Sequence, residues 1–145
     1  MEDDSSIFTM IIEGEIPCHK VYEDDLIFAF LDINPSSPGH TLVVPKEPAR
    51  TLDELSDDSA QAIGRALPRI SKAVLKATGA SEFNVIQNNG PNAFQSVLHV
   101  HFHIIPKMED GRGLSFPFTP SPIDHEDGAR LSSSIRDLLS RPPSQ

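Results

Sequence analysis

Cysteine is almost absent from this chain of 145 residues, in which Cys18 is the single example. One cysteine cannot form an intrachain disulfide, which is typical of proteins kept in a reducing compartment. Long hydrophobic runs are missing too, and the acidic start MEDDSS has no basic segment ahead of an apolar one. The sequence therefore predicts no membrane span, no signal peptide and a cytoplasmic location, with a nuclear one also open in a eukaryote.

Positive charge is scarce as well, because 12 lysines and arginines stand against 21 aspartates and glutamates. The formal net charge of −9 disfavours nucleic-acid binding, which depends on basic side chains that neutralise phosphates. An anionic partner would have to be held locally, by backbone N–H groups and a few placed side chains. The length predicts a single domain over residues 1–145. After Lys107 the composition becomes rich in Pro, Gly and Ser, so 108–145 is expected to be a C-terminal extension of the 6–107 core.

Hydrophobic periodicity predicts an α+β fold around an antiparallel sheet. Helices are expected at 6–14, with Ile7, Met10 and Ile11 on one face, at 57–78, and around Leu131, Ile135 and Leu138. Strands are expected at 39–46, 82–88 and 98–106, and on both sides of the turn Glu23-Asp24-Asp25 within 20–33. Pro45, near the end of its strand, indicates an edge strand or a strand exit.

The helix at 57–78 has the clearest pattern. Ser56 can cap it, Gly79 can end it, and Pro68 is expected to kink it without breaking it. The residues with helical spacing that define its apolar face are Ile63, Leu67, Ile70 and Val74.

Half of the six histidines fall within five residues of the stretch SVLHVHFHIIPK, on every second position. Successive side chains of a strand point to opposite faces. His99, His101 and His103 therefore share one face. The opposite face, which would pack on a core, carries Val100, Phe102 and Ile104.

Three interpretations of this histidine face compete. A solvated face is disfavoured, because Thr, Lys or Glu would serve without titrating near neutral pH. Zinc binding is possible for His-x-His, but there is no Cys-x-x-Cys, and the other candidate ligands are scattered: Cys18, His19, His40 and His125. In the third interpretation a neutral imidazole attacks phosphorus, and the preceding loop NGPNAFQS supplies backbone N–H groups for phosphate oxygens.

With these residues in view, the sequence resembles the histidine triad (HIT) family, whose signature is His-x-His-x-His with apolar x residues and two apolar positions after it. HVHFHII matches that signature, and GEIP, YEDD, FLDINPSSPGHTLVVPK and NNGPNAFQSVLHVHFHIIPK are also similar to the family, over residues 6–107. The most similar branch is the Hint-like purine nucleoside phosphoramidases. The resemblance implies a five-stranded antiparallel sheet that continues across a homodimer.

The resemblance also implies roles for individual residues. His101 would attack the α-phosphorus and form a nucleotidyl-histidine, and His103 would hold a phosphate oxygen. His99 would support the site together with His40, and Ser96 would contact the phosphate or the leaving group. The implied nucleotide-binding residues are Ile7, Phe8, Phe30, Asp32, Ile33, Asn88, Ala93, Phe94, Gln95, Ser96, His101 and His103.

Structural alternatives remain open for some of these residues. Asp32 could merely cap the turn before Pro35, and Asn88 could be only a turn residue. Ile7 and Phe8 could be plain core residues.

One feature of many family members is missing. Their structural zinc is held by an N-terminal Cys-x-x-Cys, a histidine after the VPK strand and a triad histidine, whereas this chain has Ser6, Thr9 and Pro48 at the first three positions. We therefore expect no metal and no cofactor. The expected activity is hydrolysis of purine nucleoside 5′-phosphoramidates or related AMP derivatives. The alternatives are diadenosine polyphosphate hydrolysis and a nucleotide-binding regulatory dimer with little catalysis.

Overall fold

The computed structural model describes residues 6–116 and 118–141, which form two compact units. The first unit ends at Leu114 and the second begins at Ser115. The second unit contains helix α3 (His125–Leu139), whose first turn is capped by the Asp124 carboxylate. The single-domain organisation stays a prediction. Among the residues described, no helix is both long enough and apolar enough to cross a membrane.

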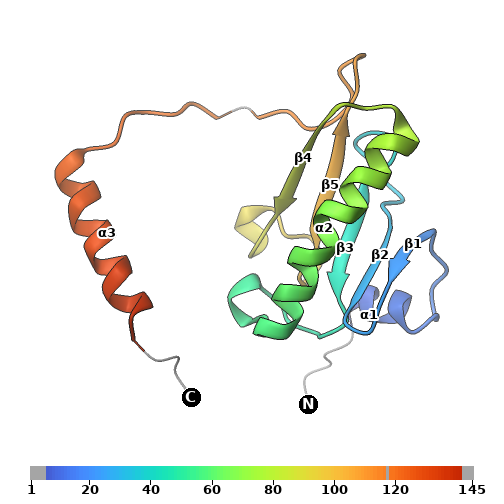
Figure 1. Cartoon of the computed structure of the whole chain (residues 1–145), viewed down its shortest axis with the longest axis horizontal. Coiled ribbons are helices and arrows are strands. Elements are labelled where there is room, and N and C mark those ends of the chain that lie inside the picture. Colours follow the sequence, from blue (N-terminus) through green and yellow to red (C-terminus); the bar gives the residue numbers. More distant parts are fainter. Residues whose placement is uncertain (1–5, 117, 142–145) are drawn as a thin grey trace. The chain divides into compact units, whose positions relative to one another are not determined.

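The first unit is built on a five-stranded sheet, which confirms the predicted fold class (Figure 1). Its elements are α1 (Ile7–Ile12), β1 (Lys20–Glu23), β2 (Ile27–Leu31), β3 (Thr41–Pro45), η1 (Leu52–Glu54), α2 (Asp57–Thr78), β4 (Glu82–Gln87), η2 (Pro91–Ala93) and β5 (Phe102–Lys107). The strand order is β1-β2-β3-β5-β4, and each neighbouring pair is antiparallel.

Helix α2 covers one face of the sheet. Its bounds are those predicted: the Ser56 side chain accepts the Ser59 N–H, and Gly79 follows with a φ of 79°. Pro68 lies inside the helix, which continues through it. The hydrophobic core on this face is formed by Ile27, Ala29, Val43, Ala62, Ile63, Ala66, Ile70, Val74 and Ile104.

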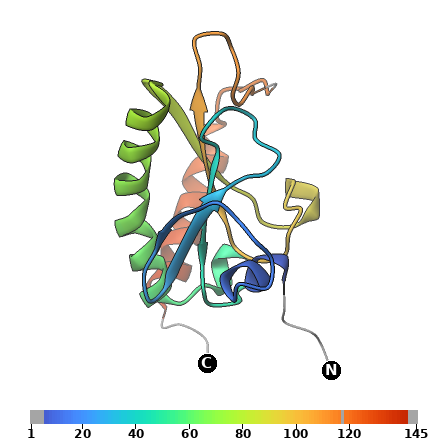
Figure 2. The same cartoon turned by 90° about the vertical axis from the view of Figure 1, so that its right-hand side faces the viewer.

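Helix α1 lies on the opposite side of the sheet from α2 (Figure 2). A second core cluster forms there from Phe8, Phe28, Phe30, Leu42 and Val44. Because side chains alternate along a strand, Phe28 and Phe30 of β2 reach this cluster while Ile27 and Ala29 reach the other. Strands β2 and β3 are therefore buried on both faces.

The most deeply buried residue of α1 is Phe8, which does not belong to the predicted face of Ile7, Met10 and Ile11. Ile7 and Met10 are 49% and 37% exposed, whereas Phe8 is buried. The Phe8 ring packs edge-on against the Phe30 ring, with centroids 5.6 Å apart. Ile11 and Ile12 pack against the same cluster, so α1 is anchored to the sheet by an aromatic residue together with aliphatic ones.

The expected strand at 98–106 begins later, at Phe102. The N–H of Val100 donates to the carbonyl of Ala49, and the carbonyl of His99 accepts from the His101 ring. These two peptide groups therefore make hydrogen bonds outside the sheet, and residues 98–101 are not part of the strand. Pro45 marks the exit of β3 and not an edge strand, because β3 lies between β2 and β5.

Candidate active site

Four histidines meet where β2, β3 and β5 come together. Asp32 directly follows β2 and His40 directly precedes β3, and the Asp32 N–H donates to the His40 carbonyl at 2.9 Å. His103 lies opposite Leu42 in the β3–β5 register. Antiparallel pairing thus brings together residues that are more than sixty positions apart in the chain.

These imidazoles are not a solvated face. His99, His101 and His40 are only 1%, 3% and 5% exposed. Burial lowers the pKa of each of the three. For His103, burial and the neighbouring rings of His101 and His40 together lower the pKa to about 4, although the Asp32 carboxylate opposes the shift. All four rings are therefore neutral near pH 7.

Hydrogen bonds assign the ring protons of His40 and His103. The Ser36 N–H donates to His40 Nδ1 at 3.0 Å, so the His40 proton lies on Nε2. That N–H points to His103 Nδ1 at 2.9 Å, with an Asp32 oxygen 3.5 Å away. Since His103 Nδ1 must accept, its own proton lies on Nε2. His103 therefore offers an N–H donor from its remaining nitrogen.

His101 has the opposite tautomer. Its Nδ1 lies 2.7 Å from the carbonyl oxygen of His99, which can only accept, so Nδ1 carries the proton. Nε2 of His101 then keeps its lone pair. The ring is held edge-on by Phe8 and by His103, with centroids 4.9 and 5.0 Å away. The site thus combines a nucleophilic lone pair with a neighbouring N–H donor.

A cavity of about 260 Å³ opens beside His101 and His103. The predicted site residues that line it are Ile7, Phe8, Phe30, Asp32, Ile33, Ser96, His101 and His103. Asp32 also accepts the Asn34 N–H at 2.8 Å, so it caps the turn before Pro35 in addition to lining the cavity. Its second oxygen is the one nearer His40.

Sequence reasoning missed seven residues of the wall: Ile11, Ile16, Pro17, Cys18, Asn34, Leu42 and Val97. Two of them had a usable signal. Ile11 lies one helical turn after Phe8, and Leu42 shares the alternation of its strand with His40. The others come from irregular segments, where no periodicity indicates the direction of a side chain.

Four predicted nucleotide-binding residues are absent from the described wall of this cavity: Asn88, Ala93, Phe94 and Gln95. Gln95 is 4% exposed, and both ends of its amide are occupied by backbone. Its oxygen accepts the Gly90 N–H, and its nitrogen donates to the Arg50 carbonyl. Asn88 donates to the Phe94 carbonyl at 3.4 Å. Gln95 therefore shapes the loop, and a phosphate role for these four residues stays a prediction.

His99 and His40 support the site from outside the cavity wall. His99 Nε2 lies 2.8 Å from the Pro45 carbonyl oxygen and its Nδ1 lies 2.8 Å from Ser6 Oγ. The partner of His40 is His103 and not His99. The structure thus brings the predicted catalytic residues together, with His40 bonded to His103 and His99 bonded to the Pro45 carbonyl and Ser6.

Among the described residues, one group of donor atoms is close enough to hold a metal ion, since atoms of Asp32, His40 and His103 lie within 4.8 Å of one another. A metal on His40 Nε2 would move the His40 proton to Nδ1. There it would oppose the Ser36 N–H, which already points at that atom from 3.0 Å. The donor set therefore does not fit a metal at this position.

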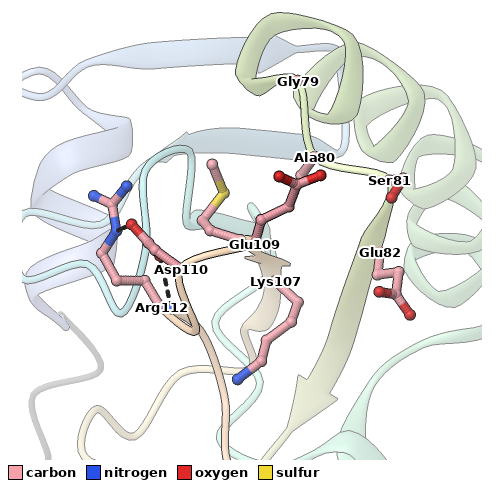
Figure 3. Close-up of a pocket in the computed structure, with 9 residues that line it drawn as sticks. Gly79, Ala80, Ser81, Glu82, Lys107, Glu109, Asp110 and Arg112 are labelled. Carbon is pink, nitrogen blue, oxygen red and sulfur yellow. Dashed lines mark hydrogen bonds and ion pairs between the residues drawn. The ribbon is translucent and has the colours of Figure 1, made fainter.

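A larger hollow of about 420 Å³ lies at the other end of β5, beyond Lys107 (Figure 3). Its described wall includes Glu82, Lys107, Glu109, Asp110 and Arg112. Asp110 pairs with Arg112 at 2.8 Å, and the lysine donates to carbonyls of the following loop. The described wall of this hollow holds no histidine or cysteine, so it lacks an imidazole like those that line the His101 cavity.

Comparisons with known proteins agree with this geometry. The family model described as HIT domain matches residues 13–110. Adenosine 5′-monophosphoramidase hnt1 of Schizosaccharomyces pombe is 48% identical over 136 residues, which span 91% of this chain and 99% of that protein. Adenylylsulfatase HINT3 of Arabidopsis thaliana is 47% identical over 103 residues, 71% of this chain and 52% of that protein. A crystal structure of a HIT family member from Bacillus subtilis matches with a TM-score of 0.87 and 39% identity, covering 97% of this chain and 99% of that chain.

The fold and the buried imidazole cluster define a histidine triad enzyme. The chain belongs to the HIT family. It is a hydrolase of that type, as the resemblance in HVHFHII implied.

Proposed function

We propose that this enzyme hydrolyses nucleoside 5′-phosphoramidates at the α-phosphorus, with His101 as the nucleophile. The observation that carries the proposal is the tautomer of His101, whose Nδ1–H is held by the His99 carbonyl at 2.7 Å. The lone pair of Nε2 is therefore free, and the ring lines the cavity. The similarity to a protein named adenosine 5′-monophosphoramidase supports the choice of a P–N bond.

The chemistry divides into two displacements. His101 Nε2 forms a bond to phosphorus while the P–N bond breaks, and the leaving nitrogen takes its electron pair and a proton from solvent. Water then attacks the phosphorus of the nucleotidyl-histidine, Nε2 leaves with its pair, and a proton is released. The net products are the nucleoside monophosphate and the free amine.

Two neighbours of His101 stabilise the charges that develop. The ring becomes positive when Nε2 is bonded to phosphorus, and the His99 carbonyl holds its Nδ1–H at 2.7 Å throughout. Negative charge grows on the phosphate oxygens, where the His103 N–H can donate. His40 keeps that donor in place through its bond to His103 Nδ1.

The size of the cavity agrees with a mononucleotide derivative. Its volume of about 260 Å³ is close to the lower end, roughly 300 Å³, of pockets that hold small ligands. Phe8, Phe30 and Leu42 offer an apolar wall for a base, and the Asp32 carboxylate can accept ribose hydroxyl protons. A second nucleoside, as in a diadenosine polyphosphate, would have to lie outside this cavity.

An adenylyl-amine substrate with a fluorogenic leaving group tests the proposal. We expect turnover by the wild type and a loss of at least about 10³-fold in His101→Ala, which removes the attacking atom. His19→Ala is the matched control, since this exposed histidine does not line the cavity. Equal turnover in wild type and His101→Ala would remove His101 from the chemistry.

A second candidate substrate is adenylyl sulfate, favoured by the similarity to a protein named adenylylsulfatase. Both substrates present the α-phosphorus of AMP and differ in the leaving group. Comparing kcat/KM for adenylyl amine, adenylyl sulfate and diadenosine polyphosphate separates these candidates. Tight AMP binding with no turnover of any of the three would favour the regulatory dimer.

We also propose that two copies associate through β4, which is an edge strand of the sheet. Its side chains Phe83 and Val85 are 39% and 42% exposed beside an apolar groove formed with Leu67 and Leu75 of α2. Sedimentation velocity should report a dimer for the wild type and a monomer for Val85→Lys. An unchanged dimer in that variant would place the interface elsewhere.

A further inference from the structure

Ser6 links the first helix to the triad across 93 residues of sequence. It is the N-cap of α1, where its Oγ accepts the N–H of Thr9 at 3.0 Å. The same oxygen lies 2.8 Å from Nδ1 of His99, a ring that is 1% exposed. One hydroxyl group therefore serves a helix end and a buried imidazole together.

The direction of the Ser6–His99 bond follows from the other side of the ring. His99 Nε2 lies 2.8 Å from the Pro45 carbonyl oxygen, which can only accept, so the ring proton is on Nε2. Nδ1 then carries a lone pair, and the Ser6 hydroxyl must donate to it. The hydroxyl thus donates to His99 and accepts from Thr9 N–H.

Two short paths lead from Ser6 to His101. In the first path, Ser6 holds the His99 ring, and the carbonyl of the same residue accepts the His101 Nδ1–H at 2.7 Å. The second path runs through α1 to Phe8, whose ring lies 5.9 Å from that of His99 and 4.9 Å from that of His101. Phe8 also lines the cavity.

We infer that Ser6 is a positioning residue for the nucleophile, because its hydroxyl fixes both the ring of His99 and the start of the helix that packs on His101. This inference rests on the proposed function of His101. Ser6 touches neither the cavity nor the reacting atoms, so it acts only through His99 and Phe8. Its essential property is the ability to donate a hydrogen bond while it caps α1.

The comparison of Ser6→Asn with Ser6→Asp tests that property, because both side chains are good N-caps but only Asn can also donate. We expect Ser6→Asn to keep kcat within about threefold of wild type. We expect Ser6→Asp to lose about tenfold or more, because a carboxylate can only accept, so that its bond to His99 forms only when the ring gains a second proton and a positive charge. The carboxylate should also draw a proton onto His99 Nδ1. The acid limb of the kcat profile should therefore move in Ser6→Asp and stay in place in Ser6→Asn.

Ring ¹⁵N chemical shifts give a readout that is independent of turnover. His99 should have its proton on Nε2 in the wild type and in Ser6→Asn, and on both nitrogens in Ser6→Asp. Thr9→Val is a further control, because it removes only the Thr9 hydroxyl, which lies 3.3 Å from Ser6 Oγ, and keeps the capped N–H. We expect its kcat and its pH profile to match wild type.

The outcomes separate this inference from the proposed function. If the wild type does not turn over the adenylyl amine, the proposed function fails, while the ring shifts still report the bond to Ser6. If the wild type is active and Ser6→Asp has the kcat, pH profile and His99 shifts of Ser6→Asn, donation by Ser6 does not position the site and the inference is overturned.

Discussion

The two faces of the sheet contrast sharply, although the same strands build both. On the α2 face, Ile27, Val43 and Ile104 pack with aliphatic residues of the helix. On the α1 face, Phe30 and Leu42 share the space with buried imidazoles. Hydrocarbon can be buried by shape alone, whereas each buried ring nitrogen needs a partner. The α2 face is therefore expected to carry stability, and the α1 face chemistry.

The largest expected effect on this contrast comes from Ile104→Ala on the α2 face. Ile104 is fully buried, and its truncation should lower the free energy of unfolding by about 2–5 kcal/mol through lost burial and a cavity. The kcat of the molecules that remain folded should change little. Urea unfolding and turnover, measured on the same preparation, check both expectations.

Ile135→Ala is the matched control for that variant. Ile135 is 55% exposed on α3, so the same truncation should change stability by no more than about 0.5 kcal/mol. A similar loss in both variants would mean that burial on the α2 face is not what stabilises the fold.

On the α1 face, His40→Phe should have the opposite effect to Ile104→Ala, namely a lower kcat with little change in stability. Phe keeps the ring volume but removes the N–H that holds His103 Nδ1 at 2.9 Å. The His103 N–H, which we propose donates to the phosphate, then loses its fixed orientation, and kcat should fall by up to about 10²-fold, as when a single oxyanion donor is removed. Single-turnover kinetics separate this effect from product release.

Wild-type single-turnover rates in His40→Phe would contradict the assignment of the His103 proton to Nε2. In that case the hydrogen bond from His40 to His103 would not contribute to catalysis on the α1 face. His40→Asn sharpens the result, because an amide can still donate to His103 and should restore part of the rate.

A smaller effect is expected from acid. His40, His99, His101 and His103 have pKa values lowered from 6.5, so the unfolded chain binds protons that the native chain does not. Stability should therefore fall as the pH drops below about 6.5. The carboxylates whose native pKa is also lowered, such as Glu47, add to this fall only below the ordinary glutamate pKa of 4.5.

The urea midpoint of unfolding should thus decrease as the pH is lowered from 7.5 to 5. We attribute this decrease to the buried histidines of the α1 face. His103→Asn removes the group whose pKa is lowered to about 4, so it should flatten that slope. His19→Asn, on an exposed histidine, is the control and should leave the slope unchanged. Parallel slopes in all three proteins would assign the acid sensitivity to other groups.

Local sequence signals predicted the elements whose causes are local. The helix at 57–78 has its cap at Ser56 and its end at Gly79 in the chain itself, and both bounds were correct. The alternation of HVHFHI correctly placed Ile104 and His103 on opposite faces of the strand. Ile104 lies in the hydrophobic core, and His103 lies on the cavity wall. The start of that strand was wrong, because the Val100 N–H is used by Ala49, far away in sequence.

The sequence by itself determined the α+β fold, the long helix and a row of histidines on one side of a strand, because side-chain periodicity and capping depend only on neighbours in the chain. Tertiary structure decided the rest. No sequence motif indicates that the backbone groups of Ser36 and Pro45 contact histidines. These contacts determine which nitrogen carries the proton in His40 and in His99. Which nitrogen of each ring keeps the lone pair was therefore decided by hydrogen bonds to other segments, since a ring's tautomer depends on what lies opposite each nitrogen.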